Sequence, residues 1–95
     1  MWFNVIMKIK SGYIFRNIAD QPMVIPVSDR IADFNGIISL NEAGAFLWRL
    51  LEPGAERDEL ISALLGEYDL SRTDAEKDVD DFIKILSERN VLENQ

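Results

Sequence analysis

The sequence contains no cysteine and no histidine. No disulfide, thiolate nucleophile or zinc–thiolate site can therefore form. The absence of histidine also excludes the Ser–His and Cys–His catalytic arrangements and removes the commonest transition-metal ligand. No stretch reaches the roughly 18 consecutive apolar residues that a membrane span needs, and no glycine-rich loop has the spacing that cradles a phosphate. These absences argue against an autonomous enzyme, and we expect no metal or other cofactor.

The chain has 95 residues, of which 47% are apolar and 28% are charged. This composition is typical of one small soluble domain. The first seven residues are apolar but lack the basic region and cleavage site of a signal peptide, so we expect a cytoplasmic protein with no membrane partner. We expect residues 1–9 to form an N-terminal extension or an extra strand, and residues 10–95 to form the single domain.

Acidic residues are concentrated in the second half of the chain. The formal net charge of −7 divides into +1 for residues 1–50 and −8 for residues 51–95. A surface of this sign repels phosphate backbones and favours cationic or neutral partners.

Three short segments in the first forty residues are typical of β-strands. Residues 13–18 are rich in aromatic and β-branched side chains, and residues 23–27 form a second apolar run after the turn-forming residues 20–22. Residues 37–40 form the third, directly after Asn35-Gly36, a strong signal for a tight turn. Whether residues 31–34 pair with the third strand or belong to the loop stays open.

Helical spacing begins at Asn41, a residue suited to cap a helix. Apolar residues then recur every three or four positions, which predicts helices over about residues 42–51, 57–68 and 72–90. We interpret Trp48 and Gly44 of the first helix as packing residues, with Gly44 permitting the close approach of another element. Three strands followed by three helices indicate an α+β fold.

Carboxylates are the catalytic candidates present in quantity, and residues 78–81 (Asp-Val-Asp-Asp) resemble a metal-binding motif. On a helix, however, Asp78 and Asp80 lie about 200° apart and cannot converge on one ion. We therefore interpret this run as a solvated and partly self-paired face, not as a metal site. The spacing predicts two i,i+4 ion pairs, Asp80 with Lys84 and Lys77 with Asp81.

A helical wheel of the third helix gathers Asp78, Ile85 and Arg89 on one shoulder, next to Phe82 of the buried stripe. Ile85 is an apolar residue off the buried face, flanked by charges of both signs. A single exposed isoleucine is common. The shoulder therefore gains meaning only if the edge of a strand lies beside it and forms a groove.

Several motifs in this sequence have the order and spacing that are typical of a known protein family. The strand-to-helix junction Leu40-Asn41-Glu42-Ala43-Gly44 is followed by Trp48 and Leu50-Leu51, and later by Asp78-Val79, Phe82-Ile83 and Leu86. Tyr13-Ile14-Phe15-Arg16 and Glu67-Tyr68-Asp69 complete the set. Over roughly residues 10–93 the sequence resembles the PqqD-like family, the peptide-binding domains (RiPP recognition elements) of ribosomal-peptide modification pathways.

The resemblance implies a winged-helix-like fold, a three-stranded antiparallel sheet packed on three helices, and it implies no catalysis. Members bind the leader of a precursor peptide and present it to a modifying enzyme, often a radical S-adenosylmethionine (SAM) enzyme. The leader adds as a strand to the third strand and lies beside the third helix, so that main-chain hydrogen bonds give affinity and pockets give specificity. The peptide-binding residues implied here are Ile37, Ile38, Ser39, Leu40, Asp78, Asp81, Phe82, Ile85 and Arg89.

Within that set, we expect Phe82 and Ile85 to hold an apolar leader side chain and Asp78 and Asp81 to favour a basic one. The chain departs from the family pattern in two places. Residues 2–6 are extra, which leaves homodimer formation open. The second helix has no serine or threonine cap, which should cost about 1 kcal/mol of helix stability.

Two other functions compete with peptide binding. A winged-helix fold also suits a nucleic-acid-binding protein, but residues 72–90 carry four bases and six acids, the wrong sign for a recognition helix. We therefore expect no nucleic-acid partner. The third alternative is an oligomerisation module that associates through residues 2–6.

Overall fold

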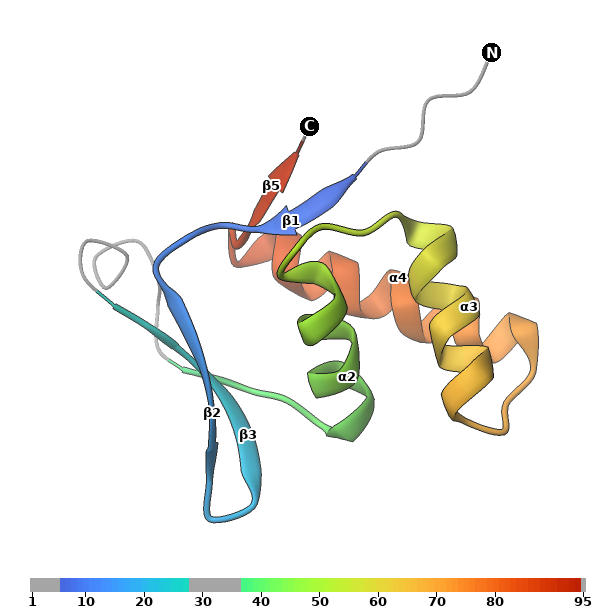
Figure 1. Cartoon of the computed structure of the whole chain (residues 1–95), viewed down its shortest axis with the longest axis horizontal. Coiled ribbons are helices and arrows are strands. Elements are labelled where there is room, and N and C mark those ends of the chain that lie inside the picture. The colour runs from blue at the N-terminus through green and yellow to red at the C-terminus, as the bar shows by residue number, and fades with distance from the viewer. Residues whose placement is uncertain (1–5, 28–36, 95) are drawn as a thin grey trace.

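The computed structural model describes residues 6–27 and 37–94 of the chain. In chain order the elements are β1 (Met7–Ile9), β2 (Tyr13–Ile18), β3 (Gln21–Pro26), β4 (Ile38–Ser39), α2 (Glu42–Leu51), α3 (Arg57–Glu67), α4 (Arg72–Glu88) and β5 (Leu92–Asn94). The helices gather on one side, and the β2–β3 hairpin extends away from them (Figure 1). The α+β fold, with its three-stranded antiparallel sheet and three helices, is confirmed. The predictions for residues 2–5 and 31–36 lie outside the described residues.

Strands β2, β3 and β4 form the main sheet in that order, with Val24 opposite both Phe15 and Ile38. The β2–β3 turn consists of Ala19 and Asp20, whose φ angles of 52° and 65° are left-handed. A two-residue turn of this kind matches the twist of a hairpin. The predicted turn at residues 20–22 with a strand from residue 23 is wrong, because β3 already begins at Gln21.

The two prolines of β3 explain how the strand can begin so early. The N–H of Val27 donates to the carbonyl of Gly12 at 2.8 Å. Main-chain groups alternate in direction along an antiparallel strand, so the odd-numbered residues of β3 face β2. Pro22 and Pro26 lie at the even positions, where the missing N–H does not interrupt the β2–β3 ladder.

Each of the three described helices begins with a side-chain cap. Asn41 Oδ1 accepts a 2.7 Å hydrogen bond from the N–H of Gly44 at the start of α2, and the Ser71 hydroxyl caps α4. At α3, which lacks a serine or threonine, Glu56 and Glu59 form a reciprocal capping box, and the Glu59 carboxylate accepts from the Glu56 N–H at 2.8 Å. The box satisfies the same N–H groups that a hydroxyl cap would satisfy.

A second, two-stranded sheet joins the two ends of the chain. Strand β1 pairs antiparallel with β5, with Met7 opposite Asn94 and Ile9 opposite Leu92. On its other side, Met7 exchanges two main-chain hydrogen bonds of 2.9 Å with Ala55, which lies between α2 and α3. The side chains of Met7 and Ile9 are buried in the core.

The core lies between the helices and the inner face of the sheet. Trp48 is fully buried at its centre and donates from its indole N–H to Glu52 at 3.2 Å, so its interpretation as a packing residue is confirmed. The other large side chains that are fully buried in this core are Val24, Leu47, Leu51, Leu60, Ile61, Leu64, Val79, Leu86 and Val91. None of the described helices is both long enough and apolar enough to cross a bilayer.

Candidate functional site

Strand β4 is an open edge of the main sheet. It pairs with β3 on one side, and no strand of the described chain pairs with its other side. The strand continues through Leu40 and Asn41 directly into α2 (Figure 1). The edge therefore ends at the helical layer.

The main-chain groups of β4 that point outward can be assigned from one hydrogen bond. The N–H of Leu40 donates to the carbonyl of Pro22 at 2.9 Å. By alternation, Ile38 and Leu40 face β3, whereas Ile37 and Ser39 direct their N–H and C=O groups toward the open edge. The side chains of Ile38 and Leu40 are buried, while Ile37 is 54% exposed. A further strand could pair here through Ile37 and Ser39.

The Gln21 side chain anchors Leu40, the residue directly after β4, a role that the sequence alone does not indicate. The carbonyl of Leu40 faces Pro22, which has no N–H to donate. The Gln21 side chain fills this position, because its Nε2 donates to the Leu40 carbonyl at 2.8 Å and to the Pro22 carbonyl at 3.2 Å. Gln21 thus replaces the missing ladder bond.

A hollow of about 220 Å³ lies between the start of α2 and α4, where β4 passes into the helix. The α4 wall consists of residues from the predicted site, namely Asp78, Asp81, Phe82 and Ile85. The α2 wall consists of Asn41, Ala43, Gly44 and Leu47. The hollow therefore has apolar walls and a polar, acidic rim.

Because Gly44 has no side chain, α2 and α4 can pack closely at the hollow. A Cβ atom at this position would lie 3.3 Å from Cε1 of Phe82, 3.0 Å from Oδ1 of Asn41 and 3.6 Å from Cβ of Leu40. Gly44 thus brings the end of β4, the start of α2 and the ring of Phe82 to one point. The expectation that this glycine permits a close approach is confirmed.

Two of the three carboxylates in residues 78–81 are engaged in ion pairs. Asp80 accepts two hydrogen bonds from Arg57 of α3, at 2.7 and 2.9 Å, so the predicted Asp80–Lys84 pairing is wrong. The hydrogen bond from Arg57 lowers the pKa of Asp80, and the same pair raises the pKa of Arg57. The predicted pair of Lys77 with Asp81 is confirmed at 2.8 Å, and its hydrogen bond raises the pKa of Lys77.

Asp78 differs from its two acidic neighbours. It lines the hollow and is exposed, and it makes no hydrogen bond or ion pair with the part of the chain that the structure describes. The described residues contain no group of three or more carboxylate, histidine or cysteine side chains that could hold a metal ion. Arg89, the C-cap residue of α4, is exposed and does not line the hollow.

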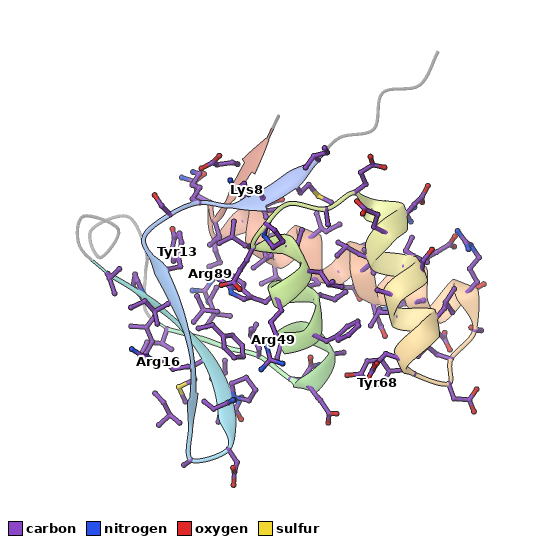
Figure 2. All side chains as sticks on the ribbon, viewed as in Figure 1. Lys8, Tyr13, Arg16, Arg49, Tyr68 and Arg89 are labelled. Atoms are coloured by element: carbon purple, nitrogen blue, oxygen red, sulfur yellow. The ribbon has the colours of Figure 1, made fainter. Side chains whose placement is uncertain are left out.

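A second hollow, of about 480 Å³, lies on the other flank of α2, between the β2–β3 hairpin and the end of α3. On this flank Arg49 extends toward β2 (Figure 2), and its guanidinium carbon lies 5.0 Å from the centroid of the Phe15 ring. Burial, with help from the nearby carboxylates of Glu42 and Glu67, raises the pKa of Tyr68. Asn41 lines both hollows.

The structure thus brings together part of the set of residues named from the sequence. Asp78, Asp81, Phe82 and Ile85 share one hollow, and residues 37–40 run into it without lining it. Sequence reasoning missed the lining contributed by Asn41, Ala43 and Leu47, and the anchoring role of Gln21. The cap at Asn41 was the one available signal, because it fixes where α2 begins.

The described residues form a small α+β domain in which an open strand edge runs toward a hollow between two helices. Comparison of the sequence with protein families identifies the family of this domain. The family model described as coenzyme PQQ synthesis protein D (PqqD) matches residues 5–92, and the chain belongs to this family. No curated protein sequence matches the chain significantly.

Two solved structures share the fold. One, described as TbiB1 in complex with the TbiA(beta) leader peptide, has 27% sequence identity and a TM-score of 0.72, over 90% of this chain and 94% of that one. The other, described as lasso peptide synthetase B1 complexed with the leader peptide, has 18% identity and the same TM-score of 0.72, over 92% of this chain and 96% of that one. Both comparisons cover nearly the whole chain on each side.

Proposed function

We propose that this domain binds the leader segment of a ribosomally synthesised precursor peptide and presents it to a modifying enzyme, without itself catalysing the modification. The observation that carries the proposal is the open edge of β4, which runs into the hollow between α2 and α4. TbiB1, which shares the fold at 27% identity, is described in complex with a leader peptide. Membership of the PqqD family agrees with the same function.

The leader binds by adding a strand to β4. Its main chain exchanges hydrogen bonds with the outward-facing groups of Ile37 and Ser39, and this pairing supplies affinity without regard to sequence. Ile38 and Leu40 support the strand from the core side. A side chain of the leader that points toward α4 enters the hollow and contacts the residues Asp78, Asp81, Phe82 and Ile85. Arg89, at the C-cap of α4, lies outside the hollow and contacts the leader beyond it.

The enzyme that receives the leader is a separate protein, for which a radical SAM enzyme is the leading candidate on family grounds. The domain itself offers no histidine or cysteine for catalysis. Its task in this arrangement is to hold the leader in one register, so that the enzyme meets the rest of the precursor at a defined distance.

A backbone-amide NMR titration of the domain tests this function, with synthetic peptides from short reading frames encoded beside its gene. Binding should shift the amide signals of residues 37–40 and 78–89. Silence across every peptide would overturn the proposal. Salt-sensitive binding to duplex DNA, with shifts on α4, would favour nucleic-acid recognition instead.

The strand-pairing mode has its own test at Ser39. Proline at this position removes an N–H that faces the open edge, so Ser39→Pro should weaken binding at least about tenfold with the core intact. Ser39→Ala keeps the N–H and is the matched control. Proline at Ile38 is a poorer choice, because the N–H of Ile38 faces β3 and its loss disturbs the sheet itself. Undiminished binding by Ser39→Pro would exclude strand addition.

A further inference from the structure

The hollow beside β4 combines two chemistries in one small space. Phe82 is 8% exposed and Ile85 is 46% exposed, so together they offer an apolar surface with an open side. Asp78 lies one helical turn before Phe82 and lines the same hollow. A side chain that enters must therefore satisfy an apolar wall and a carboxylate together.

Of the three carboxylates in residues 78–81, Asp78 is the one that forms no ion pair within the described residues and can therefore pair with a ligand. Asp80 is held by Arg57 on the α3 side, and Asp81 is held by Lys77. Within the described residues Asp78 has no such partner. An acidic neighbour at Asp81 and a net charge of −8 over residues 51–95 strengthen the attraction of this rim for a cation.

A purely apolar side chain would suit this hollow poorly. It would cover the walls, but it would also remove water from the Asp78 carboxylate without giving it a hydrogen bond, which is unfavourable. An acidic side chain would be repelled. A long side chain with an aliphatic stem and a cationic head meets both demands, since lysine and arginine lay their methylene groups on apolar surfaces and keep the charge in a polar environment.

We propose, resting on the leader-binding function above, that the hollow selects a leader with one lysine or arginine at a fixed position. The stem of that side chain lies against Phe82 and Ile85, and its ammonium or guanidinium group pairs with Asp78. The sequence-based expectation has two leader side chains here, an apolar one held by Phe82 and Ile85 and a basic one favoured by Asp78 and Asp81. A single side chain fills the hollow, and Asp78 is the residue that reads its charge.

A random dodecapeptide library displayed on phage tests this specificity with the intact domain as bait. Peptides selected by the wild-type domain should carry lysine or arginine at one position in a common register. Peptides selected by Asp78→Lys should carry glutamate or aspartate there. Selected peptides that bind the β4 edge with no basic preference would overturn this inference and leave leader binding standing. Failure to select any peptide that Ser39→Pro weakens would overturn both.

A double-mutant cycle on one selected peptide measures the contact directly. Replacing its lysine by norleucine keeps the stem and removes the charge, and should weaken binding about tenfold, as should Asp78→Asn with the lysine peptide. The two changes together should cost no more than either alone. If the two losses simply add, the ammonium group does not contact Asp78 and the inference is wrong.

Two control variants separate the contact from a general charge effect. Asp74→Asn removes one negative charge from α4 at a residue that does not line the hollow, and should change affinity less than about twofold. Ile85→Ala trims an exposed side chain and leaves the fold intact, and it should weaken the lysine and norleucine peptides equally. An equal loss with Asp74→Asn and Asp78→Asn would reduce the effect to bulk electrostatics and overturn the inference.

Discussion

The side-chain amide of Gln21 donates a 2.8 Å hydrogen bond to the main-chain carbonyl of Leu40, at the position where Pro22 has no N–H to give. This bond anchors Leu40, the residue directly after β4, to the neighbouring strand, next to the hollow. The strand that carries the open edge is only two residues long, so we expect this bond to contribute to its position.

Gln21→Ala should lower the free energy of unfolding by about 1 kcal/mol, because the Leu40 carbonyl loses its partner. Urea denaturation measures the loss, and hydrogen exchange at the Leu40 N–H should speed up. Pro22→Ala restores a main-chain N–H that faces Leu40, so Gln21→Ala should cost less in that background. An unchanged cost in the Pro22→Ala background would show that the Gln21 side chain acts in some other way.

Gly44 and Gly66 should respond in opposite directions to alanine. Both are helical, but a Cβ at Gly44 would crowd Phe82 and Asn41, whereas one at Gly66 meets nothing within 4 Å. Gly66→Ala should stabilise the domain by about 0.5–1 kcal/mol. Gly44→Ala should destabilise it by about 1 kcal/mol, since overpacking outweighs the gain in helix propensity. Thermal unfolding of the two variants checks both signs, and stabilisation by Gly44→Ala would contradict the tight packing.

The ion pair of Arg57 with Asp80 should make stability depend on pH. Because the pKa of Asp80 is lowered in the folded state, the stabilisation is present above the unfolded pKa of about 4 and is lost as the pH falls through the folded value. Both side chains are about half exposed, so the pair should contribute only about 0.5–1 kcal/mol.

Asp80→Asn tests this dependence by urea unfolding at pH 7 and near pH 2. The variant should be less stable than the wild type at pH 7, and the two should converge at low pH. Asp69→Asn is the matched control, because Asp69 is exposed in the connector between α3 and α4 and makes no bond to Arg57. A gap between wild type and Asp80→Asn that persists at low pH would contradict the ion-pair origin.

Asn41→Ala should lower stability and alter the surroundings of both hollows. The variant loses the 2.7 Å cap on the Gly44 N–H, which should cost about 1 kcal/mol. Asn41→Asp keeps an acceptor for that N–H and should retain stability. Because Asn41 lines both hollows, amide signals on both flanks of α2 should shift in Asn41→Ala. Shifts confined to one flank would show that the two hollows are independent.

Local patterns in the sequence sufficed for the elements that are stabilised locally. The three helices follow from apolar spacing and caps, and the strand at residues 13–18 follows from its side chains. The start of β3 was wrong because proline and glutamine read as a turn, whereas the missing N–H of Pro22 simply faces away from β2. The β1–β5 sheet joins residues at opposite ends of the chain, and no local signal reports such a pairing.

The candidate site also has a part that local sequence patterns predict and a part that depends on tertiary packing. A helical wheel places Asp78, Phe82 and Ile85 on one face because they belong to one helix. The opposite wall comes from α2, and the distance between the helices depends on Gly44. Asp80 was paired with Lys84 on the basis of spacing, but Arg57 of another helix takes both of its oxygens. Tertiary partners of this kind override local spacing.

The pairing of Met7 with Asn94 makes the backbone almost a closed ring. A linker attached at either end would start from the same small sheet, so fusion to another protein before residue 7 or after residue 94 would present the β4 edge in nearly the same direction. The ring could also be closed with a short linker and opened at the Ala19-Asp20 turn. Such a circular permutant would keep every strand pair and move only the ends.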